Sequence, residues 1–236
     1  TINQVITMSN INEFLNETIE IGQKLTNAKS NITKIQELQA QLLDNHISTI
    51  KEDLLNKERE NFVSNTRNLL VECKDHIKRI QYENARIPSS DPNFGQRQQR
   101  YEYLKTKLSN VLEDYSQVES DFMKKTKDRM TGQYKVVKPN ATQQEIDDYV
   151  SNSSNSDSQS MISQQASLNT NEINEAQKVL AEVQKRHEYI KNIENTVAEL
   201  TALSRDLHLH DQTDQTIINN EQYVQDAENN LACVLL

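Results

Sequence analysis

The last quarter of the chain, residues 173–231, carries small and apolar side chains at alternating steps of three and four. This spacing is typical of a coiled-coil helix with one narrow apolar seam. Arg186 is its only large polar interruption, and the flanking faces are almost wholly Glu, Gln, Lys, Asn and Thr. Because such a helix gains little stability from its own chain, we expect it to need partner helices. The seam positions are Ala176, Val179, Val183, Ile190, Ile193, Val197, Leu200, Ser204 and Leu207.

The seam changes register after Leu207. Continuing the first register would bury carboxylates at Asp211, Asp214 and Glu221, which have no evident partners. A second register, one residue away, fits better, so we expect two zippering halves joined by a weak polar stretch at residues 208–216. In the second register, residues spaced by seven form two rows: Ile217, Val224 and Leu231, and Asn220, Ala227 and Val234.

The composition favours long helices. The 236 residues include three glycines and three prolines, which leaves too little turn chemistry for a multistranded sheet. A net charge of −9 disfavours nucleic acid as a partner, since phosphate binding needs a basic surface. Cys73 and Cys233 lie far apart, without the spacing of a zinc site or a disulfide framework. We therefore predict an all-α protein with no metal and no cofactor.

Three further helices are expected before the seam. The first begins after Ser9 or Asn10, and residues 44–46 interrupt the pattern before the second, at about residues 47–87. Pro88 ends the second helix, Pro92 and Gly95 complete the turn, and the third helix stops near Gly132. Joined by short turns, they predict an antiparallel three-helix bundle with a groove for a fourth helix. The inward-facing residues of the first helix are Ile11, Phe14, Ile21, Leu25, Ile32, Ile35 and Leu42; those of the second are Leu55, Phe62, Leu69, Cys73, Ile77 and Ile80; those of the third are Leu104, Leu108, Val111, Tyr115, Val118 and Phe122.

The pattern changes after Gly132. Residues 134–139 look extended, and Thr142 with Glu145 looks like a cap that opens a short helix to Val150. Residues 151–170 have the serine-rich composition of a linker. We expect a bundle domain at 1–134, a linker at 135–172 and a coiled-coil segment at 173–236.

This layout resembles the syntaxins, the Qa class of SNARE proteins, over roughly residues 10–231. Two stretches are similar to syntaxin sequences: DYSQVESDFMKKTKDRMTGQYKVVKPNATQQEID at 114–147, in which QYKVVKPNAT is most like fungal Sso-type proteins, and AEVQKRHEYIKNIENTVAELTALSRDL at 181–207. Arg186, His187 and Glu194 match the R-H-x-x-x-x-x-x-E pattern of the SNARE motif. The resemblance implies an Habc-type bundle and makes the seam a set of SNARE core layers, from Val183 to Leu231.

The central layer departs from the family pattern. A Qa-SNARE carries glutamine there, but the first register places Asp214 at that layer and the second places Thr213. A one-residue deletion relative to the family fits this region, so Gln212 is the preferred candidate and Gln215 the second. The resemblance also implies a C-terminal membrane anchor beyond Leu236.

The resemblance implies a target-membrane SNARE that zippers with a vesicle (synaptobrevin-type) SNARE and a SNAP-type SNARE to drive exocytic fusion. It further implies binding of an SM-family (Sec/Munc) regulator and a place on the cytosolic face of the plasma membrane. No catalytic motif is present, so we expect no enzyme activity. His208 and His210 lie two residues apart and would not share a metal on a helix, and His187 reads as a flank residue. The alternative is a structural or tethering coiled-coil adaptor without fusion activity.

Overall fold

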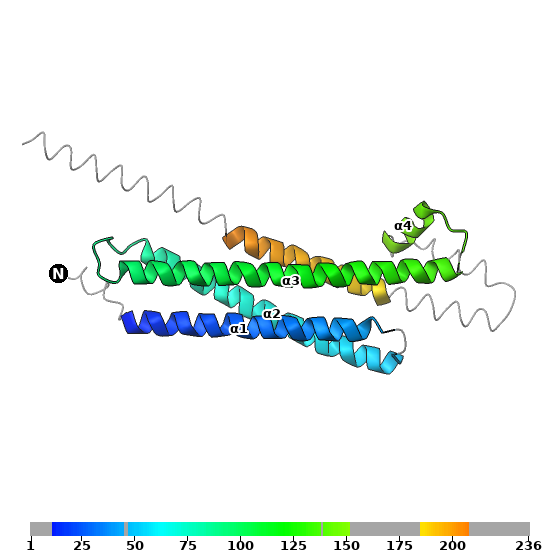
Figure 1. Ribbon diagram of the computed structural model, residues 1–236, viewed down its shortest axis with the longest axis horizontal. Coiled ribbons are helices and arrows are strands. Elements are labelled where there is room, and N and C mark those ends of the chain that lie inside the picture. Colours follow the sequence, from blue (N-terminus) through cyan, green and yellow to red (C-terminus); the bar gives the residue numbers. More distant parts are fainter. Residues whose placement is uncertain (1–10, 45–46, 138, 152–184, 208–236) are drawn as a thin grey trace, which may run out of the picture. The chain divides into compact units, whose positions relative to one another are not determined.

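The computed structural model describes residues 11–44, 47–137, 139–151 and 185–207. Within these ranges the regular structure is entirely helical, which confirms the all-α prediction (Figure 1). The elements are α1 (Ile11–Leu42), α2 (Thr49–Asn84), α3 (Phe94–Val137) and α4 (Gln143–Ser151). A further helix covers residues 185–207, and we call it the C-terminal helix.

The chain divides into two compact units. The first unit contains α1, α2, the part of α3 up to Tyr115 and the part of the C-terminal helix from Leu200. The second unit contains the rest of α3, α4 and the part of the C-terminal helix up to Glu199.

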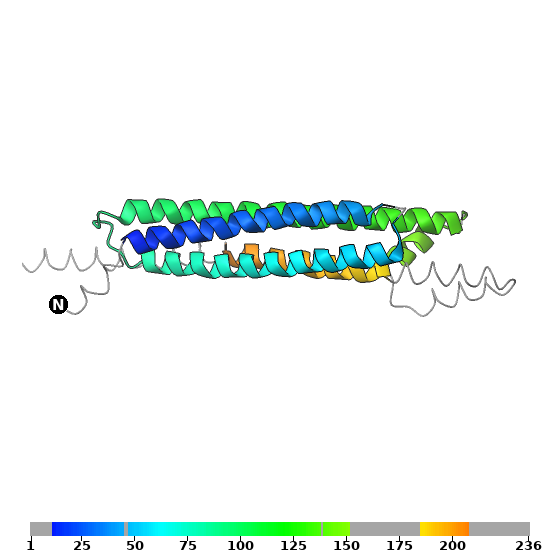
Figure 2. The same ribbon diagram turned by 90° about the horizontal axis from the view of Figure 1, so that it is seen from below.

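In the first unit α1 and α2 lie side by side and run antiparallel (Figure 2). Cys73 on α2 is placed at the level of Ile21, its thiol 3.9 Å from the Ile21 carbonyl, and Lys24 pairs with Glu72. The residue numbers of these pairs have a nearly constant sum, as antiparallel neighbours require. The short connection through Ser48, whose hydroxyl accepts the Lys51 amide at 3.4 Å and caps α2, reverses the chain.

The first part of α3 runs parallel to α1. The Lys107 ammonium donates to the Gly22 carbonyl at 2.8 Å, and Lys29 reaches Asp114 at 3.0 Å. The numerical separation of these pairs is constant, at 85. The turn before α3 is held by the Asp91 carboxylate, which accepts the Asn93 amide at 2.7 Å. The expectation that Gly95 completes this turn is wrong, because Gly95 belongs to α3.

The buried face of α2 differs from the heptad expected. Phe62 and Leu69 are only half-buried, whereas Leu70, Thr66 and Arg59 are buried. A straight α-helix rotates by about 20° per heptad, so positions seven apart drift away from the core. The polar Thr66 is accommodated because its hydroxyl donates to the Phe62 carbonyl at 2.7 Å. Val118 on α3 is likewise half-buried.

The expected end of α3 near Gly132 is wrong. The helix continues to Val137, so residues 134–137 are helical rather than extended. A glycine inside a helix costs roughly 1 kcal/mol against alanine. The contacts that Gln133 and Tyr134 make in the second unit oppose this cost. The predicted start of the short helix is confirmed, because Thr142 and Glu145 form a capping box in which the Glu145 carboxylate accepts the Thr142 amide at 2.8 Å.

Candidate functional site

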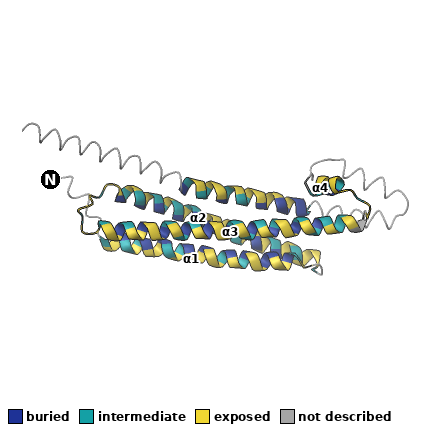
Figure 3. Ribbon diagram, turned by 45° about the horizontal axis from the view of Figure 1, so that its top comes forward, coloured by how far each residue is buried: buried dark blue, intermediate teal, exposed yellow. Residues whose placement is uncertain are grey.

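The C-terminal helix buries its expected seam. Ile190, Ile193, Leu200 and Leu207 are each at most 5% exposed, while Val197 and Ser204 are half-buried. Figure 3 colours the described helices by burial and shows that buried and exposed residues alternate along them. Apolar side chains of this size contribute roughly 1.5 to 3 kcal/mol each when removed from water. These four residues, which were predicted to face partner helices, are therefore covered within this chain.

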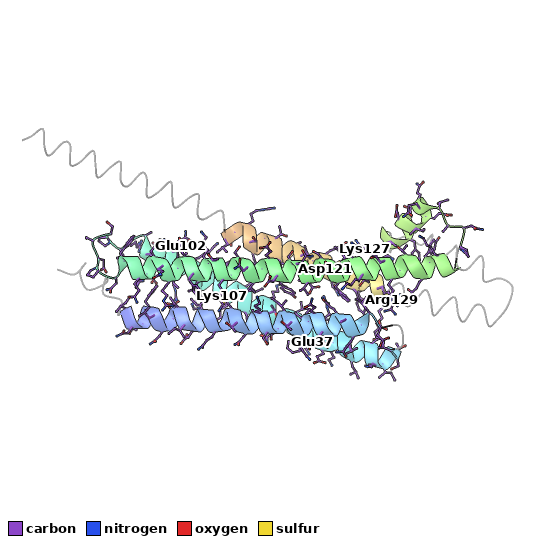
Figure 4. The ribbon with its side chains drawn as sticks, viewed as in Figure 1. Glu37, Glu102, Lys107, Asp121, Lys127 and Arg129 are labelled. Carbon is purple, nitrogen blue, oxygen red and sulfur yellow. The ribbon has the colours of Figure 1, made fainter. Side chains whose placement is uncertain are left out.

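In the second unit the C-terminal helix runs antiparallel to the end of α3. The Arg186 guanidinium donates to the side-chain oxygen of Gln133, Ile190 packs on Met130, and Glu194 approaches Lys127 with 3.6 Å between carboxylate and ammonium. In these pairs the residue number rises along the C-terminal helix while it falls along α3, as antiparallel neighbours require. Figure 4 labels Lys127 and Arg129 on this part of α3.

The Ile190–Met130 contact is the centre of a small apolar cluster. Met123 of α3 and Tyr149 and Val150 of α4 pack against it. The Tyr149 ring also stacks on Tyr134, with ring centroids 4.2 Å apart. Three helical segments of the second unit thus meet around Ile190.

Arg186 and His187 are 4% and 8% exposed. His187, which was predicted to be a flank residue of the coiled coil, is buried here: its ring meets Tyr149 edge-on, with centroids 6.5 Å apart. Burial lowers the pKa of His187, a hydrogen bond with the Tyr149 backbone raises that pKa, and the charge of Lys127 lowers it, with burial the largest effect. The sequence could not reveal this environment because Tyr149 lies in a segment with no heptad pattern.

In the first unit the end of the C-terminal helix is held to α2 by charge. The Asp206 carboxylate lies 2.7 Å from the Lys78 ammonium and 3.1 Å from that of Lys74. Hydrogen bonding from Lys78 is the largest effect and lowers the pKa of Asp206; burial opposes it, and hydrogen bonding from Lys74 lowers the pKa further. The sequence does not reveal this contact, because lysines and aspartates on polar helix faces carry no signal of pairing.

The remaining predicted positions lie outside the described residues. No group of three or more His, Cys, Asp or Glu side chains in the described ranges could hold a metal ion. None of the described helices is long and apolar enough to span a membrane. The positions outside are the seam residues Ala176, Val179, Val183, Ile217, Asn220, Val224, Ala227, Leu231 and Val234, the central-layer candidates Gln212 and Gln215, and His208 and His210.

Comparison with known proteins shows which family the chain belongs to. A family model described as Syntaxin matches residues 8–162, well over half of the chain. This chain belongs to the syntaxin family. Protein transport protein SSO2 of Candida albicans is 30% identical over 217 residues, which cover 92% of this chain and 68% of that protein. This syntaxin is therefore a SNARE protein with a role in membrane trafficking.

Two other fungal proteins are similar over much of their length. Protein SSO1 of Saccharomyces cerevisiae is 28% identical over 82% of this chain and 63% of its own length. The syntaxin-like protein psy1 of Schizosaccharomyces pombe is 28% identical over 92% of this chain and 74% of its own. This syntaxin therefore spans about two thirds of the length of these relatives.

A solved structure supports the fold. A chain in the crystal structure of the Unc18–syntaxin 1 complex from Monosiga brevicollis matches with a TM-score of 0.65. The match covers 95% of this syntaxin and 96% of that chain at 18% sequence identity.

Proposed function

We propose that this syntaxin is a target-membrane Qa-SNARE held in a closed, autoinhibited form by its own N-terminal helices. On release, the helix at residues 173–236 would zipper with a vesicle SNARE and a SNAP-type SNARE into a parallel four-helix bundle. Zippering would drive vesicle docking and fusion in exocytosis at the cytosolic face of the plasma membrane. The chain would then do mechanical work by folding rather than by catalysis.

The observation that carries this proposal is the burial of the seam. Ile190, Ile193, Leu200 and Leu207 are the large apolar residues that partner helices would cover, and all four are already buried. One apolar stripe cannot pack against two sets of neighbours at once. Assembly would therefore require the C-terminal helix to leave its intramolecular contacts first.

The domain roles follow from this competition. Residues 1–134 would be the regulatory bundle, 135–172 the linker and 173–236 the SNARE motif. Because α3 reaches Val137 and contacts the C-terminal helix through Gln133, the inhibitory surface would extend to the very end of α3.

A regulator of the SM family is the proposed partner of the closed form. The matched solved chain comes from a complex named for Unc18 and syntaxin 1. A protein that contacts both the bundle and the C-terminal helix would bind the closed form more tightly than the open form. This difference in affinity would stabilise the closed form.

The test compares assembly rates. Residues 173–236 alone should join vesicle-type and SNAP-type SNAREs many times faster than the 236-residue chain, as followed by a fluorescence reporter of complex formation. Adding an SM-family protein should slow the long chain and leave the fragment unaffected. Equal rates for the two would contradict autoinhibition, whereas failure of the fragment to join the SNAREs at all would favour the tethering adaptor.

A further inference from the structure

His187 lies where three helical segments of the second unit meet. It is 8% exposed, on the C-terminal helix. Its ring meets the Tyr149 ring of α4 at an interplanar angle of 70°, and Tyr149 in turn stacks on Tyr134 of α3 at 25°. The imidazole is thus the last of three rings that connect α3, α4 and the C-terminal helix.

The charged groups near this imidazole come from three helical segments. Lys127 of α3 acts on it electrostatically, and on its own helix His187 lies between Arg186, which is bonded to Gln133, and the exposed Glu188. On α4 Asp148, next to Tyr149, is exposed, while Glu145 accepts from Thr142 at the helix cap and the Asp147 carboxylate accepts from Gln143 at 2.9 Å. The described residues that act on the His187 imidazole therefore include no carboxylate to pair with a proton there.

The hydrogen bond with the Tyr149 backbone does not compensate for this. A carbonyl acceptor satisfies one ring nitrogen, but a second proton would put a full charge in a nearly water-free place beside Lys127. Neutral imidazole fits this environment, and imidazolium does not.

We propose that His187 is an acid-sensitive element in the contact between the C-terminal helix and α4, and that its protonation loosens that contact and favours the open form. The inference rests on the closed form proposed above. In that form the neutral ring bridges α4 and the seam beside Ile190.

The direction of the effect follows from linkage. Burial holds the pKa of His187 below its ordinary value of 6.5 in the closed form, whereas in the open form the ring is free to titrate normally. The closed form therefore keeps its full stability above about pH 6.5 and loses stability as pH falls below that value. Near pH 7.5 protonation of His187 therefore does not change the balance between the closed and open forms.

The first test is a proton NMR titration of the whole chain, which has five histidines, with resonances assigned through the backbone. The His187 ring should titrate at lower pH than a free imidazole. His76, which is half-buried and lies 3.0 Å from the Glu17 carboxylate, supplies the control position for the second test. If His187 titrates at or above the value of a free imidazole, the proposal is overturned.

The second test measures SNARE assembly at pH 7.5 and pH 5.5. The whole chain should assemble about twofold faster or more at the lower pH, relative to the fragment 173–236, which reports how pH affects the partners and His208 and His210. His187→Gln should abolish this relative rise, and the matched control His76→Gln should keep it. A rise that persists in His187→Gln overturns the role of His187.

The two proposals fail separately. If the whole chain and the fragment assemble at equal rates at pH 7.5, the closed form is absent and the proposed autoinhibition fails. If the whole chain is slow at both pH values, autoinhibition stands and the acid-sensitive element is overturned.

Discussion

Arg97 is a buried cation that joins the ends of three helices. Its Nε donates to the Asn84 side chain at 3.0 Å, its Nη2 lies 3.3 Å from the Glu83 carboxylate, and its guanidinium lies 4.0 Å from the centre of the Phe14 ring. With 4% exposure, none of these contacts can be replaced by water. A planar fork suits this site and an ammonium does not.

We predict that Arg97→Lys lowers the free energy of unfolding by about 1 to 3 kcal/mol, since a hydrogen bond to a charged group is lost in a buried place. Urea unfolding followed by circular dichroism would measure it. The control Arg100→Lys, on an exposed position three residues along α3, should change stability by less than about 0.5 kcal/mol. Equal midpoints for both variants would show that the Arg97 contacts contribute nothing.

Cys73 provides a second test at the residue scale. Burial raises the pKa of its thiol to about 11, from an ordinary 9.0. At pH 8 its thiolate population is therefore about 100-fold smaller than that of a free thiol. In Cys233→Ser, where Cys73 is the only thiol, alkylation by iodoacetamide should be slow and keep accelerating up to about pH 11. A rate that levels off near pH 9 without denaturant would contradict the buried thiol.

At the element scale, the helices and their apolar seams could be read from spacing because burial follows helix period. Ile190, Ile193, Leu200 and Leu207 were predicted as seam residues and are buried. What spacing cannot supply is rotation over many turns, which replaced Leu69 by Leu70 in α2. Spacing also cannot predict tertiary contacts. One example is the Tyr134–Tyr149 stack, which accompanies the continuation of α3 past Gly132, and another is the ring contact between Tyr149 and His187.

The Asp206 contact tests how the C-terminal helix is held to α2. Asp206→Asn should speed assembly of the whole chain up to about fivefold, because an ion pair at a partly exposed site contributes at most about 1 kcal/mol after screening. The effect should shrink in high salt. The pKa of Asp206 is lowered in the closed form. The ion pair therefore stabilises the closed form above the ordinary pKa of 3.8, and this stabilisation is lost as pH falls below that value.

The control for this prediction is Glu188→Gln, which removes a carboxylate from an exposed position of the same helix. It should leave the assembly rate unchanged. If Asp206→Asn and Glu188→Gln behave alike, the ion pair with Lys74 and Lys78 does not restrain the helix.

Leu200 and Leu207 test the assigned seam. Leu200→Ala and Leu207→Ala should each lower the stability of the assembled SNARE complex by roughly 2 to 5 kcal/mol and its melting temperature accordingly. Each residue is also buried in the closed form, at 4% and 3% exposure, so the same variants should loosen the closed chain. Asn195→Ala, on the exposed face, is the matched control. Unchanged melting of both leucine variants would mean that the register is wrong.

At the scale of the whole molecule, the proposal gives one helix two alternative sets of neighbours. The closed form satisfies the seam within the chain, and the SNARE complex would satisfy it with three partner helices. The difference in free energy between the two arrangements would decide which is populated, so in the proposed mechanism the intramolecular contacts would set the threshold for assembly. The net charge of −9 keeps the helices' outer faces soluble in either arrangement.

A reversible cross-link between α3 and the C-terminal helix would show whether the C-terminal helix must leave α3 before the chain can assemble. Lys127 and Glu194 lie 3.6 Å apart at their charged atoms, and Figure 4 labels Lys127 and the exposed Asp121 on α3. In a chain with Cys73→Ser and Cys233→Ser, Lys127→Cys with Glu194→Cys should react with a short cleavable thiosulfonate cross-linker far faster than Asp121→Cys with Glu194→Cys. We predict that the cross-linked Lys127/Glu194 chain does not assemble with its SNARE partners until a reductant cleaves the link. Assembly at the same rate before and after cleavage would contradict the closed form as the inhibited state.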